Sequence, residues 1–226
     1  MEKLLIDGKT KALYDLGNGQ YKLFFKDDMT GEDGVFDPGA NQVGLTVAGA
    51  GAAGLGLSVY FFDKLKAAGF ATHFLGADIN ARTMTIIPTT TFGKGLEVIC
   101  RYRAMGSFLR RYGSLVVEDT PLPALVEMTI KSDSSADPLI TQDSLEALGV
   151  LLPGEYVQLV ELTKNICQFI RNVLAEKNLE LCDIKLEFGK DNDGNIILMD
   201  ELSAGNMRVR KNGKTVLPLE LAELVL

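Results

Sequence analysis

Apolar and polar residues alternate between residues 182 and 199 in a pattern typical of two paired β-strands. In the first strand the alternation places Asp183, Lys185 and Glu187 on one face and apolar side chains on the other. The segment Lys-Asp-Asn-Asp-Gly between the strands is typical of a tight turn. If the hairpin pairs symmetrically about this turn, Asp200 at the end of the return strand lies close to Lys185.

The acidic face of this hairpin suits a hard cation that carries phosphate oxygens. In proteins Mg²⁺ is usually held by one or two carboxylates together with the phosphates of a substrate. The pattern is therefore compatible with acidic side chains that share one metal ion. The alternative reading, a solvated hairpin face with ordinary surface charges, stays open at this point.

The rest of the chain mixes strand-like and helix-like patterns, which predicts an α+β fold. A hairpin around Gly17-Asn18-Gly19 is expected within residues 3–26, followed by a glycine-rich loop over 27–56. The expected strands are 71–75, 83–87 and 96–103, and the expected helices are 58–68, 104–112, 142–148 and 155–177. We expect two lobes separated by a cleft. Residues 1–95 would form an antiparallel β lobe with one helix, and residues 96–226 an α/β lobe that carries the substrate and metal sites.

Composition limits the class of protein. The chain has 226 residues and a net charge of −7, which argues against broad nucleic-acid binding because that usually needs a basic surface. No apolar run is long enough to span a bilayer, and the N-terminus lacks a signal-peptide pattern. We therefore expect a cytoplasmic protein with no membrane partner. The cysteines Cys100, Cys167 and Cys182 lie in apolar stretches and are expected to be buried free thiols.

A glycine-rich run at residues 49–56 fits the GxGxxG pattern of dinucleotide-binding loops. It precedes an expected helix, and Asp78 follows at a sequence separation typical of the acidic residue that contacts the ribose in such proteins. The segment before the run is a poor first strand, however, and no second βαβ unit follows it. A flexible or helix-packing glycine run is therefore the favoured reading.

Two basic segments are candidates for phosphate binding. Lys9 and Lys11 follow Gly8 between two expected strands, where backbone amides and ammonium groups could meet a phosphate. Four arginines fall within residues 101–111 around a Gly-Ser turn that ends at Ser107. Guanidinium groups bind phosphate through two parallel hydrogen bonds. In isolation, each segment also fits ordinary exposed charges.

The chain offers no convincing nucleophile or general base. His73 is the sole histidine and lies within an expected strand, where a packed structural role is favoured. No nucleophile elbow is present. An enzyme of this sequence would therefore use phosphate and metal electrostatics rather than a catalytic triad.

Taken in order along the chain, several segments resemble the SAICAR synthetase family of purine biosynthesis. The matching segments are GKTKALY at 8–14, FKDDMT at 25–30, THF at 72–74, E-x-x-x-RYRAMGS-x-x-RR-x-G at 97–113, DPLI at 137–140, D-x-KLEFG at 183–189 and DELS…R at 200–208. Their colinearity is more specific than any one of them. The resemblance implies a two-lobed, ATP-grasp-like α+β architecture with antiparallel sheets and a nucleotide cleft between the lobes.

The resemblance also implies a reaction. Members of the family are ATP-dependent carbon–nitrogen ligases that join carboxyaminoimidazole ribonucleotide to L-aspartate and give SAICAR, ADP and phosphate. ATP and Mg²⁺ would be the cofactors, the phosphoribosyl nucleotide and L-aspartate the substrates, and a homodimer the assembly. The substrate carboxylate would be phosphorylated, and the amine would then displace the phosphate.

The same resemblance assigns roles to individual residues. Lys9, Lys11, Glu97 and Lys185 would bind ATP; Glu187 and Asp200 would hold Mg²⁺; Asp183 and Lys185 would be the catalytic pair; and Arg101, Ser107, Arg208, Lys131 and Asp137 would bind the substrates. Catalysis would come from orientation and charge neutralisation, without a covalent enzyme intermediate.

Three departures from the family pattern affect the substrate-facing segments. The usual Gly-Lys-Gly-x-x-Asn-Asn run is Gly-Ala-Gly-Ala-Ala-Gly-Leu at 49–55, without the lysine and both asparagines. The usual Ser-Pro-Asp-x-x-Arg lacks its proline and has Gly205 in place of its aspartate, and Tyr102 replaces an asparagine. Two alternatives therefore stay open: a paralogue that ligates another carboxylate and amine, and a non-catalytic nucleotide-binding regulator.

Overall fold

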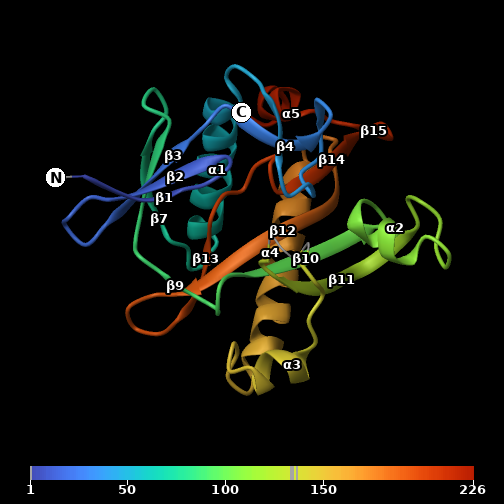
Figure 1. Ribbon diagram of the computed structural model, residues 1–226. Helices are drawn as coiled ribbons and strands as arrows, with labels where there is room; N and C mark the ends of the chain where they lie inside the picture. Colours follow the sequence, from blue (N-terminus) through green and yellow to red (C-terminus); the bar gives the residue numbers. More distant parts are fainter. Residues whose placement is uncertain (1, 133–134, 136) are drawn as a thin grey trace.

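The computed structural model describes residues 2–132, 135 and 137–226 of the protein (Figure 1). The strands are β1 (Lys3–Asp7), β2 (Lys11–Asp15), β3 (Tyr21–Phe25), β4 (Asp28–Glu32), β5 (Val35–Phe36), β6 (Val43–Thr46), β7 (Phe74–Asp78), β8 (Thr83–Ile86), β9 (Thr90–Thr91), β10 (Leu96–Arg103), β11 (Pro121–Ile130), β12 (Glu180–Lys190), β13 (Ile196–Met199), β14 (Met207–Lys211) and β15 (Lys214–Thr215). The helices are α1 (Ala50–Ala67), α2 (Ser107–Tyr112), α3 (Gln142–Ala147), α4 (Glu155–Ala175) and α5 (Pro218–Val225).

These strands form three antiparallel sheets, as the α+β prediction requires. A five-stranded sheet has the order β1-β2-β3-β8-β7, and a small three-stranded sheet has the order β5-β4-β6. A seven-stranded sheet follows the path β11-β10-β12-β14-β15, with β13 and β9 also paired to β12. Strand β12 therefore pairs with four other strands, and it is the central strand of the seven-stranded sheet (Figure 1).

The five-stranded sheet begins with the predicted N-terminal hairpin. Strands β2 and β3 pair from Lys11 opposite Phe25 to Asp15 opposite Tyr21. Gly17 and Gly19 adopt positive φ angles of 72° and 80° in the connecting turn, a conformation that glycine adopts without steric cost. The prediction of this hairpin is confirmed.

The prediction of a glycine-rich loop over residues 27–56 is wrong. Residues 28–46 contribute the three-stranded sheet, and α1 begins at Ala50 rather than at Ser58. The glycines of 49–56 lower helix propensity, but here they let the helix approach other backbone closely. A Cβ atom on Gly51 would lie 2.6 Å from the carbonyl oxygen of Phe25 and 2.7 Å from that of Lys26. The run is thus a helix-packing segment; the sheets around it are antiparallel and supply no dinucleotide-binding βαβ unit.

Helix α4 covers one face of the seven-stranded sheet (Figure 1). Its apolar stripe includes the buried residues Leu159, Ile166 and Ile170, which recur at helical spacing. The helix ends at Ala175, two residues before the predicted Lys177. The sheet face beneath α4 carries the apolar half of the β12 alternation, including Ile184, Leu186 and Phe188, all buried in the hydrophobic core. The polar half of β12 consequently faces the other way.

The predicted acidic hairpin forms, and Asp200 comes back close to Lys185, as expected. Glu187 lies opposite Met199 and Lys190 opposite Ile196. The ladder therefore pairs symmetrically about Asp193, and Asp200, which follows directly after the partner of Glu187, comes back beside Leu186 and Lys185. Asp200 itself adopts a φ of 68°, so the chain leaves the strand at this residue.

Several element boundaries differ from the predictions. Strand β7 starts at Phe74 rather than Ala71, because the residues before it pair elsewhere: Thr72 bridges Leu198, and the His73 amide donates to the Leu198 carbonyl at 2.9 Å. Strand β10 has the predicted bounds, Leu96–Arg103. Helix α5 packs against α1, and the short strand β9 pairs with β12. The lobe division at residue 95 stays a prediction.

The three cysteines are free and buried, as predicted. None of the helices in the described ranges combines the length and hydropathy required to cross a membrane.

The close approach of α1 to β3 gives a testable difference between two glycines of one helix. For Gly51→Ala we expect a loss of about 1–3 kcal/mol in the free energy of unfolding, because the added methyl meets fixed backbone oxygens. For the matched Gly54→Ala variant, whose Cβ would lie 3.7 Å from its nearest neighbours, we expect a gain of up to ~1 kcal/mol from helix propensity. Urea unfolding of both variants checks this. Equal stability of the two variants would contradict the packing role of Gly51.

Candidate active site

The polar face of the seven-stranded sheet brings together residues from three strands. Directly opposed residues on antiparallel strands point to the same side of a sheet. Glu187 and Asp183 of β12 lie opposite Glu97 and Arg101 of β10, and Arg208 of β14 also lies opposite Asp183. The face therefore has a lysine end around Glu187, named for the lysines that converge there, and an arginine end around Asp183. At ~3.3 Å per residue the two ends are about 13 Å apart along β12.

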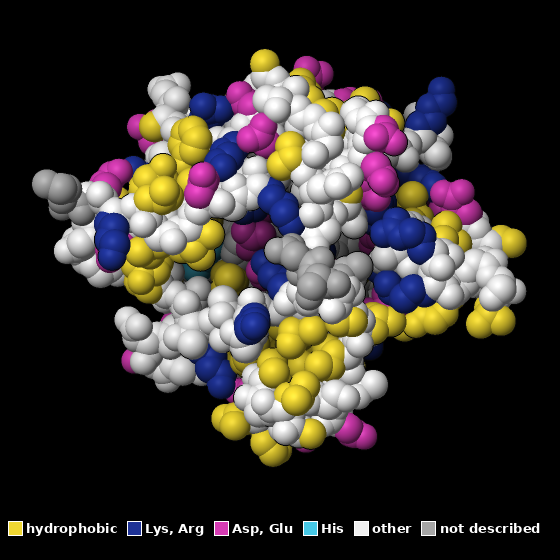
Figure 2. All heavy atoms as spheres, in the orientation of Figure 1, with side chains coloured by type: hydrophobic (Ala, Val, Ile, Leu, Met, Phe, Trp, Pro, Cys, Tyr) yellow, Lys and Arg dark blue, Asp and Glu magenta, His cyan; other side chains and the backbone are white. Residues whose placement is uncertain are grey.

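A cavity of about 780 Å³ opens at the lysine end. Figure 2 shows a hollow near the centre of this face, with acidic and basic side chains around it. The sequence-predicted site residues that line the cavity are Lys9, Lys11, Glu97, Lys131, Asp137, Lys185, Glu187 and Asp200. The other predicted residues, Asp183, Arg101, Ser107 and Arg208, are not among the described residues that line it.

Two carboxylates meet at the lysine end. Burial raises the pKa of the Glu187 carboxyl, and the nearby charge of Asp200 raises it further, against the opposing effect of lysines. Lys131 places its Nζ 2.6 Å and 2.7 Å from the two carboxylate oxygens of Glu187. Burial would also raise the pKa of Asp200, but the lysines around it, Lys11 first, outweigh burial and lower it to about 2. The pair is therefore a concentration of negative charge that requires cations.

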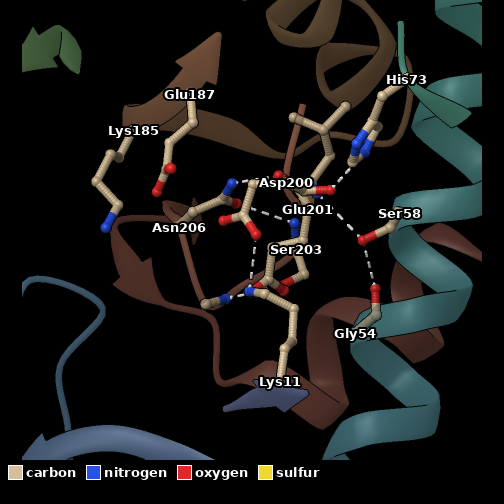
Figure 3. A network of polar contacts seen from close by, with 12 residues as sticks. Lys11, Gly54, Ser58, His73, Lys185, Glu187, Asp200, Glu201, Ser203 and Asn206 are labelled. Carbon is tan, nitrogen blue, oxygen red and sulfur yellow. Dashed lines mark hydrogen bonds and ion pairs between the residues drawn. The ribbon is translucent and has the colours of Figure 1, made fainter. Parts of the chain in front are cut away.

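Lys11 supplies one of these cations from a different sheet. It is the first residue of β2, and its Nζ lies 3.2 Å from the Asp200 carboxylate and donates to Glu201 (Figure 3). Burial by itself would lower the pKa of Lys11, but attraction to Asp200 and Glu201 outweighs burial and raises it. Lys11 thus carries a fixed positive charge into the cavity.

Hydrogen bonds from His73 and from helix α1 hold the segment that carries Asp200. The Nε2 of His73 lies 3.0 Å from the carbonyl oxygen of Asp200 (Figure 3). Burial lowers the pKa of His73 to about 4, despite the nearby Asp200, so the ring is neutral near pH 7 and donates Nε2–H to this carbonyl. Ser58 of α1 accepts the Leu202 amide at 3.1 Å and donates to the Gly54 carbonyl. His73 is a packed residue, as expected from the sequence.

Lys185 is fixed by Glu97. Its Nζ donates to Glu97 Oε1 at 2.7 Å, and Thr129 Oγ1 donates to the other oxygen of Glu97 at 2.8 Å. Burial alone would lower the pKa of Lys185, but the charges of Glu97 and Glu187 outweigh burial and raise it. The ammonium group therefore stays charged and has a defined position at the lysine end.

At the arginine end the structure brings together the predicted set of Arg101, Ser107 and Arg208. Arg101, only 1% exposed, donates from Nη2 to Ser107 Oγ and from Nη1 to Asp183 Oδ2, both at 2.9 Å. Arg208 Nη1 donates to the same Asp183 oxygen at 2.8 Å. Burial would lower the pKa of Arg208, but Asp183 and Asp37 outweigh it and raise it. Asp183 thus orients both guanidinium groups.

Lys9 and Asp137 lie at the rim of the cavity. Lys9 Nζ donates to Asn41 Oδ1 at 2.5 Å. Asp137 Oδ1 accepts the Ser132 amide at 2.7 Å, which ties its carboxylate to the backbone beside Lys131. Both positions agree with a loop that contacts a ligand from the edge of the cavity.

Four residues of the site received no role from the sequence. Glu201 binds Lys11 and accepts a hydrogen bond from Ser203, and the position of Glu201 directly after Asp200 was the available signal. Asn206 closes the same turn, because its Oδ1 accepts the Ser203 amide at 3.0 Å. Glu127 and Asp37, which pair with arginines, come from segments distant in sequence and have no local pattern that marks them.

The turn at 201–206 contains one departure from the family pattern, Gly205, and is tightly packed around it. A Cβ atom on Gly205 would lie 3.2 Å from Ser203 Oγ and 3.3 Å from Glu201 Oε1. These contacts are tight, so the hydrogen-bonded pair of Glu201 and Ser203 occupies the room that a larger side chain at 205 needs. The carboxylate that Lys11 contacts in this turn is supplied by Glu201.

The lysines of the site can neutralise a polyphosphate. The site can bind a metal ion only if a bound ligand supplies some of the metal's ligand atoms. Within the described ranges, no group of three or more His, Cys, Asp or Glu side chains is arranged to hold a metal. Two facing carboxylates do fit a cation whose other ligands are phosphate oxygens and water. The ammonium groups of Lys11, Lys131 and Lys185, from three different segments of the chain, surround them. The arrangement therefore suits chemistry on phosphate groups.

The relatives of this chain agree with that chemistry. A family model described as SAICAR synthetase matches residues 4–216. A phosphoribosylaminoimidazole-succinocarboxamide synthase of Clostridium tetani is 51% identical over 220 residues, which cover 97% of each chain. The enzyme of that name from Thermotoga maritima is 37% identical and covers 92% of this chain and 85% of its own.

Solved structures give the same answer for the fold. A SAICAR synthetase structure at 34% identity has a TM-score of 0.81 and covers 93% of this chain and 87% of its own. A SAICAR synthetase in complex with ADP, at 29% identity, has a TM-score of 0.83 and covers 94% of this chain and 87% of its own. The predicted α+β architecture is confirmed. From its sequence and its fold, the chain belongs to the SAICAR synthetase family.

Proposed function

We propose that this protein is a phosphoribosylaminoimidazole-succinocarboxamide synthase, an ATP-dependent ligase of purine biosynthesis. It would join carboxyaminoimidazole ribonucleotide and L-aspartate and release SAICAR, ADP and phosphate. The observation that carries the proposal is the pairing of two charged ends on one sheet face, about 13 Å apart along β12 at ~3.3 Å per residue. One end suits a polyphosphate, and the other suits the phosphate of a nucleotide substrate.

The lysine end would bind ATP. Lys11 and Lys185 are held in place by carboxylates and keep their charge, so they would meet phosphate oxygens without rearranging. Lys9 at the rim would contact the phosphates from the loop that precedes β2. A relative of this family has been solved with ADP bound, which supports a nucleotide at the corresponding place.

Glu187 and Asp200 would hold Mg²⁺ at the same end. The nearby charge of Asp200 raises the pKa of Glu187, and a divalent cation between the two groups would relieve this repulsion. When bound, Mg²⁺ would neutralise charge on the phosphate oxygens. Lys131, which pairs with Glu187, would then be free to contact substrate.

The arginine end would bind the substrate phosphate through Arg208, Arg101 and Ser107. Asp183 orients both arginines, so its role would be to position them and to set the distance between the two substrates. Lys185, at the lysine end, would stabilise the negative charge that develops on the transferred phosphoryl group. No covalent bond to the protein is needed, because orientation and charge neutralisation suffice for such a transfer.

The homodimer and the cytoplasmic location are further proposals. The homodimer rests on the family relationship and the cytoplasmic location on the sequence pattern; neither depends on the geometry of the site.

The direct test of the function is ADP release from purified protein with Mg-ATP, carboxyaminoimidazole ribonucleotide and L-aspartate. Mass detection identifies the product, and each substrate is omitted in turn as a control. We expect ADP only when all three substrates are present, together with the succinyl-carboxamide product. ATP binding without that product would indicate a paralogue with another substrate pair or a nucleotide-binding regulator.

For Asp200→Asn we expect kcat to fall by at least about a hundredfold, because one of two metal carboxylates loses its charge. The fold should persist, since His73 contacts only the backbone carbonyl of Asp200 and asparagine keeps the side-chain shape. The matched control is Asp193→Asn, an exposed residue in the turn of the same hairpin. Near-wild-type turnover of a folded Asp200→Asn variant would refute the metal assignment.

The Arg208→Lys variant tests whether the two ends of the site bind different substrates. A lysine keeps the charge but loses the planar fork, so KM for the phosphoribosyl substrate should rise about tenfold or more. KM for ATP should stay within about twofold, because Arg208 lies at the other end of the face. Arg103→Lys, which changes a partly exposed arginine paired with Glu180, is the control. A parallel rise in both KM values would show that the two ends do not bind different substrates.

A further inference from the structure

The two principal arginines of the arginine end are already paired with carboxylates. Arg101 lies 2.6 Å from Glu127 and 2.9 Å from Asp183. Arg208 donates from Nη1 to Asp183 at 2.8 Å and from Nη2 to Asp37 at 2.6 Å. A phosphate that binds here must therefore displace a carboxylate or share its donors.

The three carboxylates differ in how firmly they are held. Asp183 on the central strand β12 has 5% of its side chain exposed, and Glu127 on β11 has 9% exposed. Asp37 has 34% exposed and lies on the connection between β5 and β6 in the small three-stranded sheet. Of these carboxylates, Asp37 is the one whose movement leaves the seven-stranded sheet intact.

The surroundings of Arg208 make room for its contact with Asp37. A Cβ atom on Gly106, the residue before α2, would lie 2.6 Å from Nη2 of Arg208. A Cβ atom on Gly39 would lie 2.8 Å from the same nitrogen. Two glycines on different segments thus let the guanidinium reach between them. Arg110 approaches the same carboxylate, with its Nη1 3.8 Å from Asp37 Oδ2.

Asp37 is ionised and well suited to this pairing. Burial would raise the pKa of its carboxyl, but the Gly39 amide and the charge of Arg208 outweigh burial and lower the pKa. The Gly39 amide donates to Asp37 Oδ1 at 2.9 Å, the same oxygen that Arg208 contacts. The contact is therefore a charge-assisted one within a defined turn.

We propose that Asp37 is an internal competitor for the substrate-binding guanidinium of Arg208 and thereby sets which anions the arginine end accepts. The inference rests on the proposed function only in that Arg208 binds a phosphate. A phosphate dianion carries more charge and more acceptor oxygens than a carboxylate, so it can displace Asp37 from Arg208. A carboxylate ligand offers no such advantage over Asp37. The second substrate, an amino acid with two carboxylates, is thus kept away from the arginine end.

The Asp37→Asn variant removes the negative charge of the side chain but keeps its size and shape. Asparagine keeps an oxygen acceptor for the Gly39 amide, so the turn should persist. We expect ribose 5-phosphate, a probe that carries the phosphate without the base, to bind the variant about five- to tenfold more tightly by titration calorimetry. We also expect succinate to compete with ribose 5-phosphate in the variant at concentrations that do not affect the wild type. A purely structural role of Asp37 would weaken binding instead.

The matched control is Glu32→Gln, which removes one negative charge from an exposed position on β4 of the same small sheet. Its affinity for ribose 5-phosphate should stay within about twofold of the wild type, since it changes only long-range charge. If Asp37→Asn does not unfold cooperatively, Asp37→Ser keeps a short hydroxyl acceptor for the turn and takes its place.

Several outcomes would overturn the proposal. They are unchanged or weaker binding in the Asp37 variant, an equal gain in Glu32→Gln, and absence of ribose 5-phosphate binding in every variant. The titration uses neither ATP nor turnover. A failure here would therefore leave the ligase assignment to its own assay, and a protein without ligase activity could still meet this test.

Discussion

The charge balance on the polar face of β12 is the constraint on which the rest of the site depends. The strand is buried on both faces, so its acidic residues Asp183 and Glu187 lie where unpaired charge is costly. Each is matched by cations delivered from other elements: Arg101 and Arg208 for Asp183, and Lys131 for Glu187. The strand order, with β10 and β14 on either side of β12, is what brings the arginines into register. The fold and the site therefore follow from one alternating sequence.

The groups that balance these carboxylates are also the groups that would bind phosphate. Because Lys11 and Lys185 are held by Glu201 and Glu97, their positions are set before a ligand arrives. Preorganised charge of this kind stabilises a transition state without a cost of reorganisation at the moment of reaction. The arginine end follows the same logic, except that one of its carboxylates comes from a small peripheral sheet. A protein of net charge −7 can thus present strongly cationic pockets to anionic ligands.

Local pattern carried much of the prediction, and non-local contacts account for most of what it missed. The bounds of β10 and the polar face of β12 follow from strand alternation, and the site set of Arg101, Ser107 and Arg208 followed from the family resemblance. The start of α1 was missed because glycine signals a loop, whereas here Gly51 permits a close approach to β3 that only the folded chain reveals. Asp37 and Glu127 could not be assigned, since each acts through an arginine far away in sequence.

The central claim is that a metal ion takes the place of Lys131 on Glu187 and that a substrate phosphate binds Arg208 at the other end of the same sheet face. A crystal structure of the protein with ADP, Mg²⁺ and the phosphoribosyl substrate tests this most directly. We expect a metal ion bound by Glu187 and Asp200, with Lys131 moved from Glu187 toward substrate and Arg208 on the substrate phosphate. A metal ion bound elsewhere, with Lys131 still on Glu187 and the substrate phosphate away from Arg208, would contradict it.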